Sequence, residues 1–171
     1  ELAAIAYAQG PGAFTGLRIG AGVAQGLAAP FGIPLIPVPC LDAVASLCPG
    51  QAAVLAATDA RMGEVFYAWF DTQTQQCLSD YQVGKADEIR LPENLSGSLN
   101  PDGISGIGNA FALPGPPPFP GHSDMPTAEH YLALAASGRY PAVSAAEAEL
   151  LYVRNKVALT AAEQAARKGA A

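Results

Sequence analysis

A strand, a glycine-rich turn and a helix follow one another without interruption at the start of the chain. Residues 3–8 are an apolar run, residues 10–16 (GPGAFTG) mark a tight turn, and residues 17–29 have the composition of a helix that Pro30 and Gly32 end. A buried strand that leads through a turn into a helix favours an α/β fold with parallel strands. The same arrangement is a common scaffold for binding an anion at a helix N-terminus.

The turn has two interpretations that the residues alone leave open. Gly10, Gly12 and Gly16 are spaced G-x-G-x-x-x-G, one residue longer than the dinucleotide-binding fingerprint, and no Gly-Lys-Ser/Thr of a P-loop is present. One interpretation is an anion- or nucleotide-adjacent turn, to which Asn109 in a second glycine turn could contribute. The other is a structural turn that sets the entry of the helix, with Thr15 as its N-cap.

Few polar residues interrupt the helix expected at residues 17–29, since only Arg18 and Gln25 are strongly polar. A helix that is apolar on nearly every side is normally buried on nearly every side. The helix also contains internal glycines, each of which costs roughly 0.5–1 kcal/mol relative to alanine. Close packing against another element is expected to offset this cost.

Small residues recur every four positions along this helix and form one smooth stripe: Gly16, Gly20, Ala24 and Ala28. Such a stripe permits the close approach of a second helix. That helix belongs either to the same domain or to a partner protein. In the second interpretation, the predicted interface residues are Leu17, Arg18, Gly20, Ala21, Ala24, Leu27 and Ala28.

Composition restricts the class of partner. Half of the 171 residues are hydrophobic and 14% are charged, which is enough apolar material for a substantial core. The net charge is −6 and the 9 Lys and Arg residues form no run, so direct tight binding to RNA or DNA is not expected. Three cysteines without a C-x-x-C predict free thiols in a reducing cytoplasm, and no apolar run reaches the ~18 residues that span a membrane.

The whole pattern reads β-α-β-α over residues 1–50 and β-β-β-α-β-α over residues 51–171, which predicts two α/β parts. We expect the second part to repeat a complete unit of which the first part is a remnant. Because the chain begins without a methionine just before a buried type of strand, we expect that a segment preceding Glu1 is missing. The expected strands are residues 35–38, 52–58, 64–71, 77–83 and 104–107, and the expected helices are residues 41–47, 85–95 and 128–137 and a tail helix from Thr160 to Gly169. Residues 114–121 (PGPPPFPG) are expected to be an irregular connector.

Two of these elements have informative faces. In the strand at residues 64–71, both sets of alternating side chains are apolar, which predicts a central strand covered on both sides. In the helix at residues 128–137, the predicted inner face is Ala128, Tyr131, Leu132 and Ala135.

The sequence offers little support for catalysis. It contains no G-x-S-x-G and no S-x-x-K, and His122 and His130 are the only imidazole bases. A metal site from these histidines and Asp124 would match no standard ligand spacing, so no metal site is predicted. A charged cluster at the turn between two core strands consists of Asp59, Arg61 and Glu64. It is either an ion pair that shapes a hairpin or a contact for a ligand or partner.

Four stretches resemble one protein family. The residues GPGAFTGLRIG with the following helix closely resemble the signature of the TsaB family, also called YeaZ. Residues 59–65 (DARMGEV) resemble the family's DARMGEVY hairpin, residues 106–110 (GIGNA) loosely resemble its glycine turn, and residues 151–158 (LYVRNKVA) resemble its YLRN-x-VA run. Together these stretches span almost the whole chain.

The resemblance implies an actin/Hsp70/sugar-kinase-like (ASKHA) fold of two related halves, of which the first is incomplete here. The family opens with a β-hairpin, a third strand and a helix ahead of the strand that resembles residues 3–8. The family is paralogous to TsaD, the catalytic subunit that makes threonylcarbamoyladenosine in tRNA, but the metal-binding His-x-x-x-His of TsaD is absent here. TsaB itself does no chemistry and pairs with TsaD through helices of its first half, TsaE joins as an ATPase, and TsaC supplies the threonylcarbamoyl-adenylate.

The resemblance therefore implies a cytoplasmic, non-catalytic partner subunit that binds no cofactor alone, while ATP and a metal are used on partner subunits. It also implies contact with tRNA only through the complex, and we expect a second copy of the chain to take the place of TsaD when TsaD is absent. Two alternatives are a degenerate nucleotide-binding, kinase-like enzyme and a glycoprotease-like (M22-type) peptidase. Stoichiometric ATP binding would favour the first, and a zinc requirement or a protease-active serine would favour the second.

Overall fold

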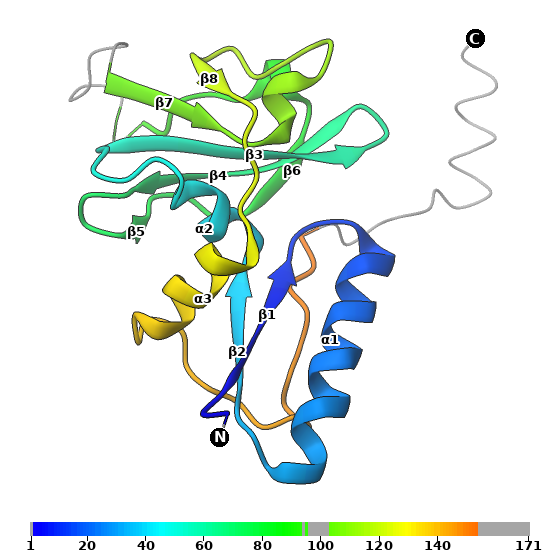
Figure 1. The fold of residues 1–171 in the computed structure, drawn as a ribbon. Coiled ribbons are helices and arrows are strands. Elements are labelled where there is room, and N and C mark those ends of the chain that lie inside the picture. Colours follow the sequence, from blue (N-terminus) through cyan, green and yellow to red (C-terminus); the bar gives the residue numbers. More distant parts are fainter. Residues whose placement is uncertain (1, 94, 96–102, 154–171) are drawn as a thin grey trace, which may run out of the picture.

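The computed structural model describes residues 2–93, 95 and 103–153 of the chain (Figure 1). Its strands form two sheets, a parallel pair in the lower part of Figure 1 and a six-stranded mixed sheet in the upper part. Helices flank both sheets, and a long extended segment returns from the upper part to the lower one. The α/β class that the sequence predicts is confirmed.

The smaller sheet carries the helix that follows the glycine-rich turn. It consists of β1 (Ile5–Gly10) and β2 (Leu35–Pro39), which pair in parallel. Between them the chain forms α1 (Phe14–Ala28) and a short 3-10 helix, η1 (Ala29–Phe31). A parallel pair needs such a crossover, and α1 supplies it by lying along one side of the sheet (Figure 1).

The start of α1 differs from the prediction. The helix begins at Phe14 rather than Leu17, and its N-cap is Ala13, which makes no side-chain capping hydrogen bond. Thr15 therefore lies inside the first turn with an exposed side chain, and the prediction that it caps the helix is wrong. The backbone at Ala13 is extended, as is usual for the residue that precedes the first turn of a helix.

The larger sheet has the order β5-β4-β3-β7-β8, and β6 also pairs with β4. Its strands are β3 (Ala53–Arg61), β4 (Glu64–Asp71), β5 (Gln76–Cys77), β6 (Gln82–Gly84), β7 (Ile104–Ile107) and β8 (Gly121–His122). β3 and β4 form an antiparallel hairpin, and β7 runs parallel to β3. The single strand predicted over residues 77–83 is instead the two short strands β5 and β6, both antiparallel to β4.

Both faces of β4 are buried, which confirms the prediction of a covered central strand. Phe66 and Phe70 pack in a core with α2 (Cys40–Ala45), the short helix that follows β2. On the opposite face Trp69 packs in a second core, where the ring of Phe119 meets it edge-on with centroids 5.0 Å apart. Phe119 belongs to the proline-rich connector, so that connector helps to close the second core.

The remaining helical segments are short. The helix predicted over residues 85–95 is wrong, because the described residues there contain only a 3-10 turn, η2 (Ala86–Glu88). A second turn, η4 (Asn109–Ala112), follows β7. α3 (Ala128–Ala136) confirms the helix predicted at residues 128–137. Of its predicted inner face, Ala128 and Leu132 are exposed, and Leu134 is buried beside Ala135 instead.

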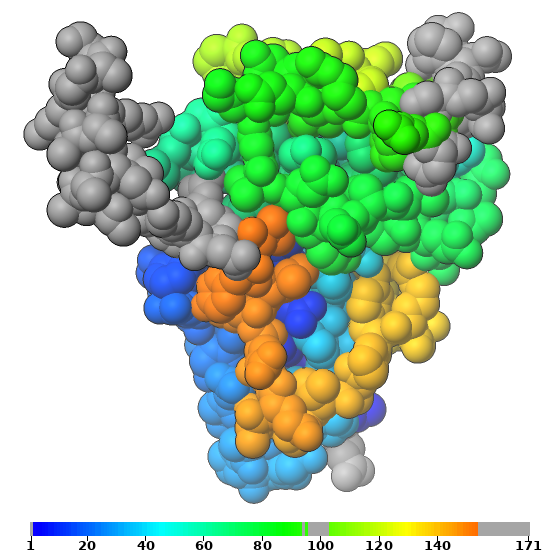
Figure 2. Space-filling model, turned by 180° about the vertical axis from the view of Figure 1, so that it is seen from behind, coloured from blue at the N-terminus to red at the C-terminus, as the bar shows by residue number. Residues whose placement is uncertain are grey.

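The segment after α3 returns to the smaller sheet. Val143 and Leu35 exchange two backbone hydrogen bonds of 2.8 Å, and the amide of Leu151 donates to the carbonyl of Gln9 at 2.8 Å. Figure 2 shows this returning segment in orange across the back of the lower part. Residues after α3 thus pack against residues that precede the domain boundary expected at residue 50, and that boundary stays a prediction. The predicted tail helix from Thr160 to Gly169 lies outside the described residues.

The tight approach of β7 to β3 gives a first testable prediction. Gly108 has φ +118°, and a Cβ there would lie 2.1 Å from the carbonyl oxygen of Ala57. Gly108→Ala should therefore lower the free energy of unfolding by about 2 kcal/mol or more, measured by chemical denaturation. Gly115→Ala is the matched control because a Cβ at Gly115 would have no atom within 4 Å, and equal stability of the two variants would contradict this account.

Candidate functional site

The side of α1 that faces away from the sheet is apolar and exposed. Three aliphatic side chains lie on it, Ile19 at 62%, Val23 at 56% and Leu27 at 58% exposure. Glycines lie between and beside them at helical spacing, and we define the α1 outer face as Gly16, Ile19, Gly20, Val23, Gly26 and Leu27. A Cβ at any of its three glycines would have no atom within 4 Å, so nothing in the described part of the chain packs onto them.

The opposite side of α1 is the one that the chain itself covers. Ala21, Ala24 and Ala28 are buried in a core with Tyr7 and Leu35. The prediction that Ala21, Ala24 and Ala28 face a partner is therefore corrected, because their small side chains let α1 lie close to the smaller sheet. The stripe of small residues that the sequence suggested divides between two sides of the helix.

Leu17 is half-buried and points inward, close to where Gly10 and Gly12 would carry side chains. Of the predicted interface residues, Arg18, Gly20 and Leu27 are exposed. Of these three, Gly20 and Leu27 lie on the α1 outer face, and Arg18 lies at its edge.

An aromatic and cationic cluster borders the N-terminal end of α1. The guanidinium of Arg18 lies 3.6 Å from the ring centroid of Phe14, and its Nε donates to the hydroxyl of Tyr152 at 3.2 Å. Phe14 and Tyr152 are each about half exposed. Arg18 thus connects α1 to the returning segment, and the stacking holds its charge in a fixed position.

The turn before α1 is shaped by close packing. Gly10 has φ +109°, and a Cβ there would lie 2.7 Å from the carbonyl oxygen of Leu151 and 3.1 Å from Cδ1 of Leu17. A Cβ at Gly12 would lie 3.6 Å from Cδ1 of Leu17, which is ordinary van der Waals contact. These contacts explain Gly10 and Gly12 through the fold of the chain, whereas Gly16 belongs to the α1 outer face. The anion-binding interpretation of the turn stays a prediction.

Asn109 and the charged hairpin come together in space. The side-chain oxygen of Asn109 accepts a hydrogen bond from the amide of Asp59 at 2.8 Å. Asp59 in turn forms an ion pair with Arg61 at 3.3 Å and accepts from its amide. Glu64 lies opposite Arg61 in the backbone register of the hairpin. This arrangement supports the interpretation of a local network that shapes the hairpin.

The described residues contain no group of three or more His, Cys, Asp or Glu side chains that could hold a metal ion. His122 pairs with Asp124 at 3.7 Å, while Nδ1 of His130 accepts from the amide of Thr127 at the start of α3. Within the same described ranges, no helix is long and apolar enough to cross a membrane.

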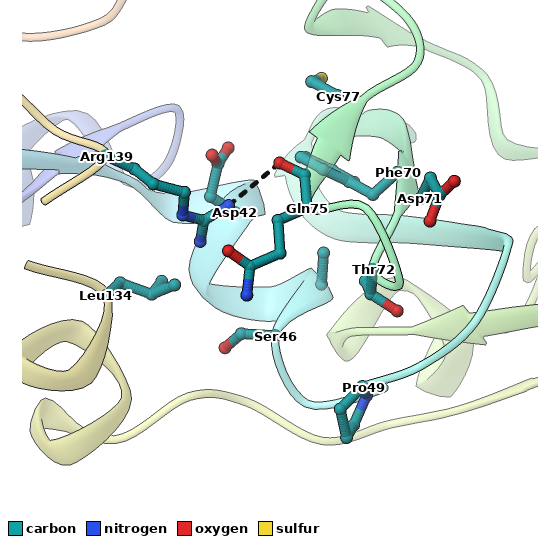
Figure 3. A pocket seen from close by; sticks show the side chains of 11 residues that line it. Asp42, Ser46, Pro49, Phe70, Asp71, Thr72, Gln75, Cys77, Leu134 and Arg139 are labelled. Carbon is teal, nitrogen blue, oxygen red and sulfur yellow. Dashed lines mark hydrogen bonds between the residues drawn. The ribbon is translucent and has the colours of Figure 1, made fainter. Parts of the chain in front are cut away.

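A small pocket lies where α2, the turn between β4 and β5, and α3 meet (Figure 3). The carboxylate of Asp42 accepts hydrogen bonds from the hydroxyls of Tyr81 and Tyr140, the second at 2.9 Å. Burial raises the pKa of Asp42, and burial together with Asp42 raises the pKa of both tyrosines, so the hydroxyls stay protonated and donate. Arg139 faces this pocket from the end of α3.

Comparison with known proteins places the chain in a family. Residues 1–116 match the family model described as TsaD: tRNA N6-adenosine threonylcarbamoyltransferase. The chain is 34% identical over 174 residues to the Escherichia coli K12 protein named tRNA threonylcarbamoyladenosine biosynthesis protein TsaB, and the match covers 92% of this chain and 73% of that protein. The protein of the same name from Haemophilus influenzae is 33% identical over 184 residues, with 92% and 72% covered.

A solved structure agrees with these relatives. A Pseudomonas aeruginosa protein described as similar to peptidase YEAZ superposes with a TM-score of 0.73 at 32% identity, and the match covers 90% of this chain and 74% of that chain. The chain therefore belongs to the TsaB (YeaZ) family. Its architecture is the ASKHA-like fold of that family, as the resemblance implies.

Part of the α1 outer face was not predicted from the sequence. Ile19, Val23 and Gly26 are not among the predicted interface residues, although Ile19, Val23 and Leu27 follow one another at intervals of four. The periodicity of the large aliphatic residues is the signal that could have found this face. No local pattern predicts that Asp42 and Arg139 line one pocket, because they are far apart in the sequence.

The two sides of α1 predict opposite responses to the same substitution. Ala24 is 4% exposed, so Ala24→Glu should place a carboxylate in an apolar core and lower the free energy of unfolding by about 3 kcal/mol or more. Val23→Glu, one residue earlier, should change it by less than about 0.5 kcal/mol. Chemical denaturation of both variants measures this difference, and a strongly destabilised Val23→Glu would show that the outer face is core.

Proposed function

We propose that this chain is a non-catalytic subunit in the biosynthesis of threonylcarbamoyladenosine in tRNA, and that it supports TsaD by binding it through the α1 outer face. The names of the relatives assign them to this pathway, and the match to the TsaD family model supports a role beside that transferase. The observation that carries the docking proposal is the exposed row of Ile19, Val23 and Leu27.

The composition of the α1 outer face suits a helix of TsaD as its occupant. Large aliphatic side chains supply apolar area that is stabilising once water is removed from it. The glycines beside them leave the helix backbone open, so a second helix can approach closely and gain dispersion contacts. The cost of the three glycines on this face, roughly 0.5–1 kcal/mol each, would then be offset in the complex rather than in the free chain.

The other parts of the proposal follow from the family and from the charge. Catalysis, ATP and the metal reside on partner subunits, TsaE joins the complex, and a second copy of the chain occupies the α1 outer face when TsaD is absent. Contact with tRNA is made through the complex, since the net charge of −6 does not favour direct binding of a polyanion. The complex operates in the cytoplasm.

A binding measurement tests the docking proposal. Val23→Glu should weaken binding to TsaD by at least about tenfold, because a charged group would have to be desolvated in an apolar interface. Binding is measured by titration with purified TsaD, and the matched control is Leu132→Glu on α3, which is similarly exposed but lies outside the α1 outer face.

Two outcomes would contradict the proposal. Equal affinity of Val23→Glu and the unsubstituted chain for TsaD would remove the α1 outer face from the interface. Threonylcarbamoyl transfer or protein hydrolysis by the purified chain, lost on substitution of His122 or His130, would replace the non-catalytic role with an enzymatic one.

A further inference from the structure

The pocket between α2, the β4–β5 turn and α3 is a site that the docking proposal does not use. It has a volume of about 120 Å³ and is partly open to solvent. Figure 3 shows the side chains of Asp42 and Arg139 on one side of it and those of Ser46 and Thr72 farther along the wall. A molecule the size of alanine or serine fits such a volume.

Three charged residues line the pocket, Asp42, Asp71 and Arg139. Asp71 already accepts from the amides of Gln73 and Thr74 in its own turn, and Asp42 and Arg139 are each bonded to neutral partners. Asp42 accepts from two tyrosine hydroxyls, and a carboxylate has about four acceptor sites, so acceptor capacity remains. Arg139 donates through Nη1 to the carbonyl of Gln75 at 3.1 Å and through Nε to the hydroxyl of Ser137 at 3.4 Å, while a guanidinium has five N–H donors. The pocket therefore offers an acceptor-only anion and a donor-only cation side by side.

The carboxylate of Asp42 is held in position by side chains from other segments of the chain. Its carboxylate is largely buried, which is costly for a charged group, and the hydroxyls of Tyr81 and Tyr140 reach it from two separate segments of the chain. Burial is the largest influence and raises the pKa of Asp42, while the two tyrosine hydroxyls and the positive charge of Arg139 act in the opposite direction and favour the ionised carboxylate. The remaining wall is partly apolar, with Phe70 and Leu134 among its residues.

We propose that this pocket binds a small zwitterion, a free α-amino acid with a short aliphatic side chain. The ammonium group of the ligand binds Asp42 and its carboxylate binds Arg139, so that each charge of the ligand meets the opposite charge. The short side chain lies against Leu134 and Phe70. This site is separate from the α1 outer face, so the proposal of amino-acid binding does not depend on the proposal of TsaD binding.

Titration calorimetry of the full chain with L-alanine and L-valine tests the site, with acetate and ethylammonium as ligands that carry one charge each. We expect the amino acids to bind with a Kd of roughly 1 mM, in keeping with the limited energy that a few heavy atoms can supply. Each single-charge probe should bind at least about tenfold more weakly, because one of the two charge-assisted contacts is missing. Equal binding of ethylammonium and alanine would overturn the zwitterion assignment.

Two isosteric or near-isosteric variants assign the charges. Asp42→Asn and Arg139→Gln should each weaken alanine binding by at least about tenfold. The matched controls are Asp87→Asn and Arg90→Gln, which remove the same charges outside the pocket and should leave binding unchanged. Chemical denaturation establishes that each variant is folded, and the single-charge probes decide the question if Asp42→Asn is not.

Absence of alanine and valine binding at tens of times the expected Kd would overturn the proposal, as would binding that survives both pocket substitutions. Val23→Glu should retain amino-acid binding even where it loses TsaD. Loss of TsaD binding with intact amino-acid binding, or the reverse, therefore separates the failure of one proposal from the failure of the other.

Discussion

The structure depends on how α1 is shared between two environments. Its alanines face the smaller sheet and let the helix lie close to β1 and β2, which is possible only because they are small. Its larger aliphatic residues face outward, where each is more than half exposed, and the described chain packs nothing onto the glycines beside them. Both sides of α1 are apolar, and the described chain buries only one of them. The apolar surface that stays exposed on the other side is the physical basis of the proposed docking role.

The segment after α3 makes the lower part of the molecule a unit. The two-stranded sheet would be marginal alone, but the backbone bonds at Val143 and Leu151 add a further layer of chain to it. The side-chain amide of Gln25 on α1 donates to the backbone carbonyl of Ala145 at 2.8 Å. The hydroxyl of Tyr7 donates to the backbone carbonyl of Glu149 at 2.9 Å. The sheet, the helix and the returning segment thus hold the outer face in a fixed orientation.

Local patterns predict the fold better than they predict the site. The two-sided apolar alternation of β4 reports directly on its burial, so its place in the sheet follows from the sequence. The all-apolar composition of α1 hides which side faces inward, because alanine and glycine suit a core and an interface equally well. The weak helix expected near residue 90 is wrong since local polar propensity without an apolar stripe does not stabilise a helix. The pocket at Asp42 depends on segments about 100 residues apart, and no local spacing encodes it.

Side-chain footprinting of α1 with and without TsaD tests the central claim most directly. In the free chain, the side chains of Ile19, Val23 and Leu27 should be oxidised readily by hydroxyl radicals, since each is more than half exposed. On addition of TsaD their oxidation should fall together, while that of Leu132 on α3 should not change. Unchanged oxidation of the α1 outer face in a chain that still binds TsaD would contradict the account.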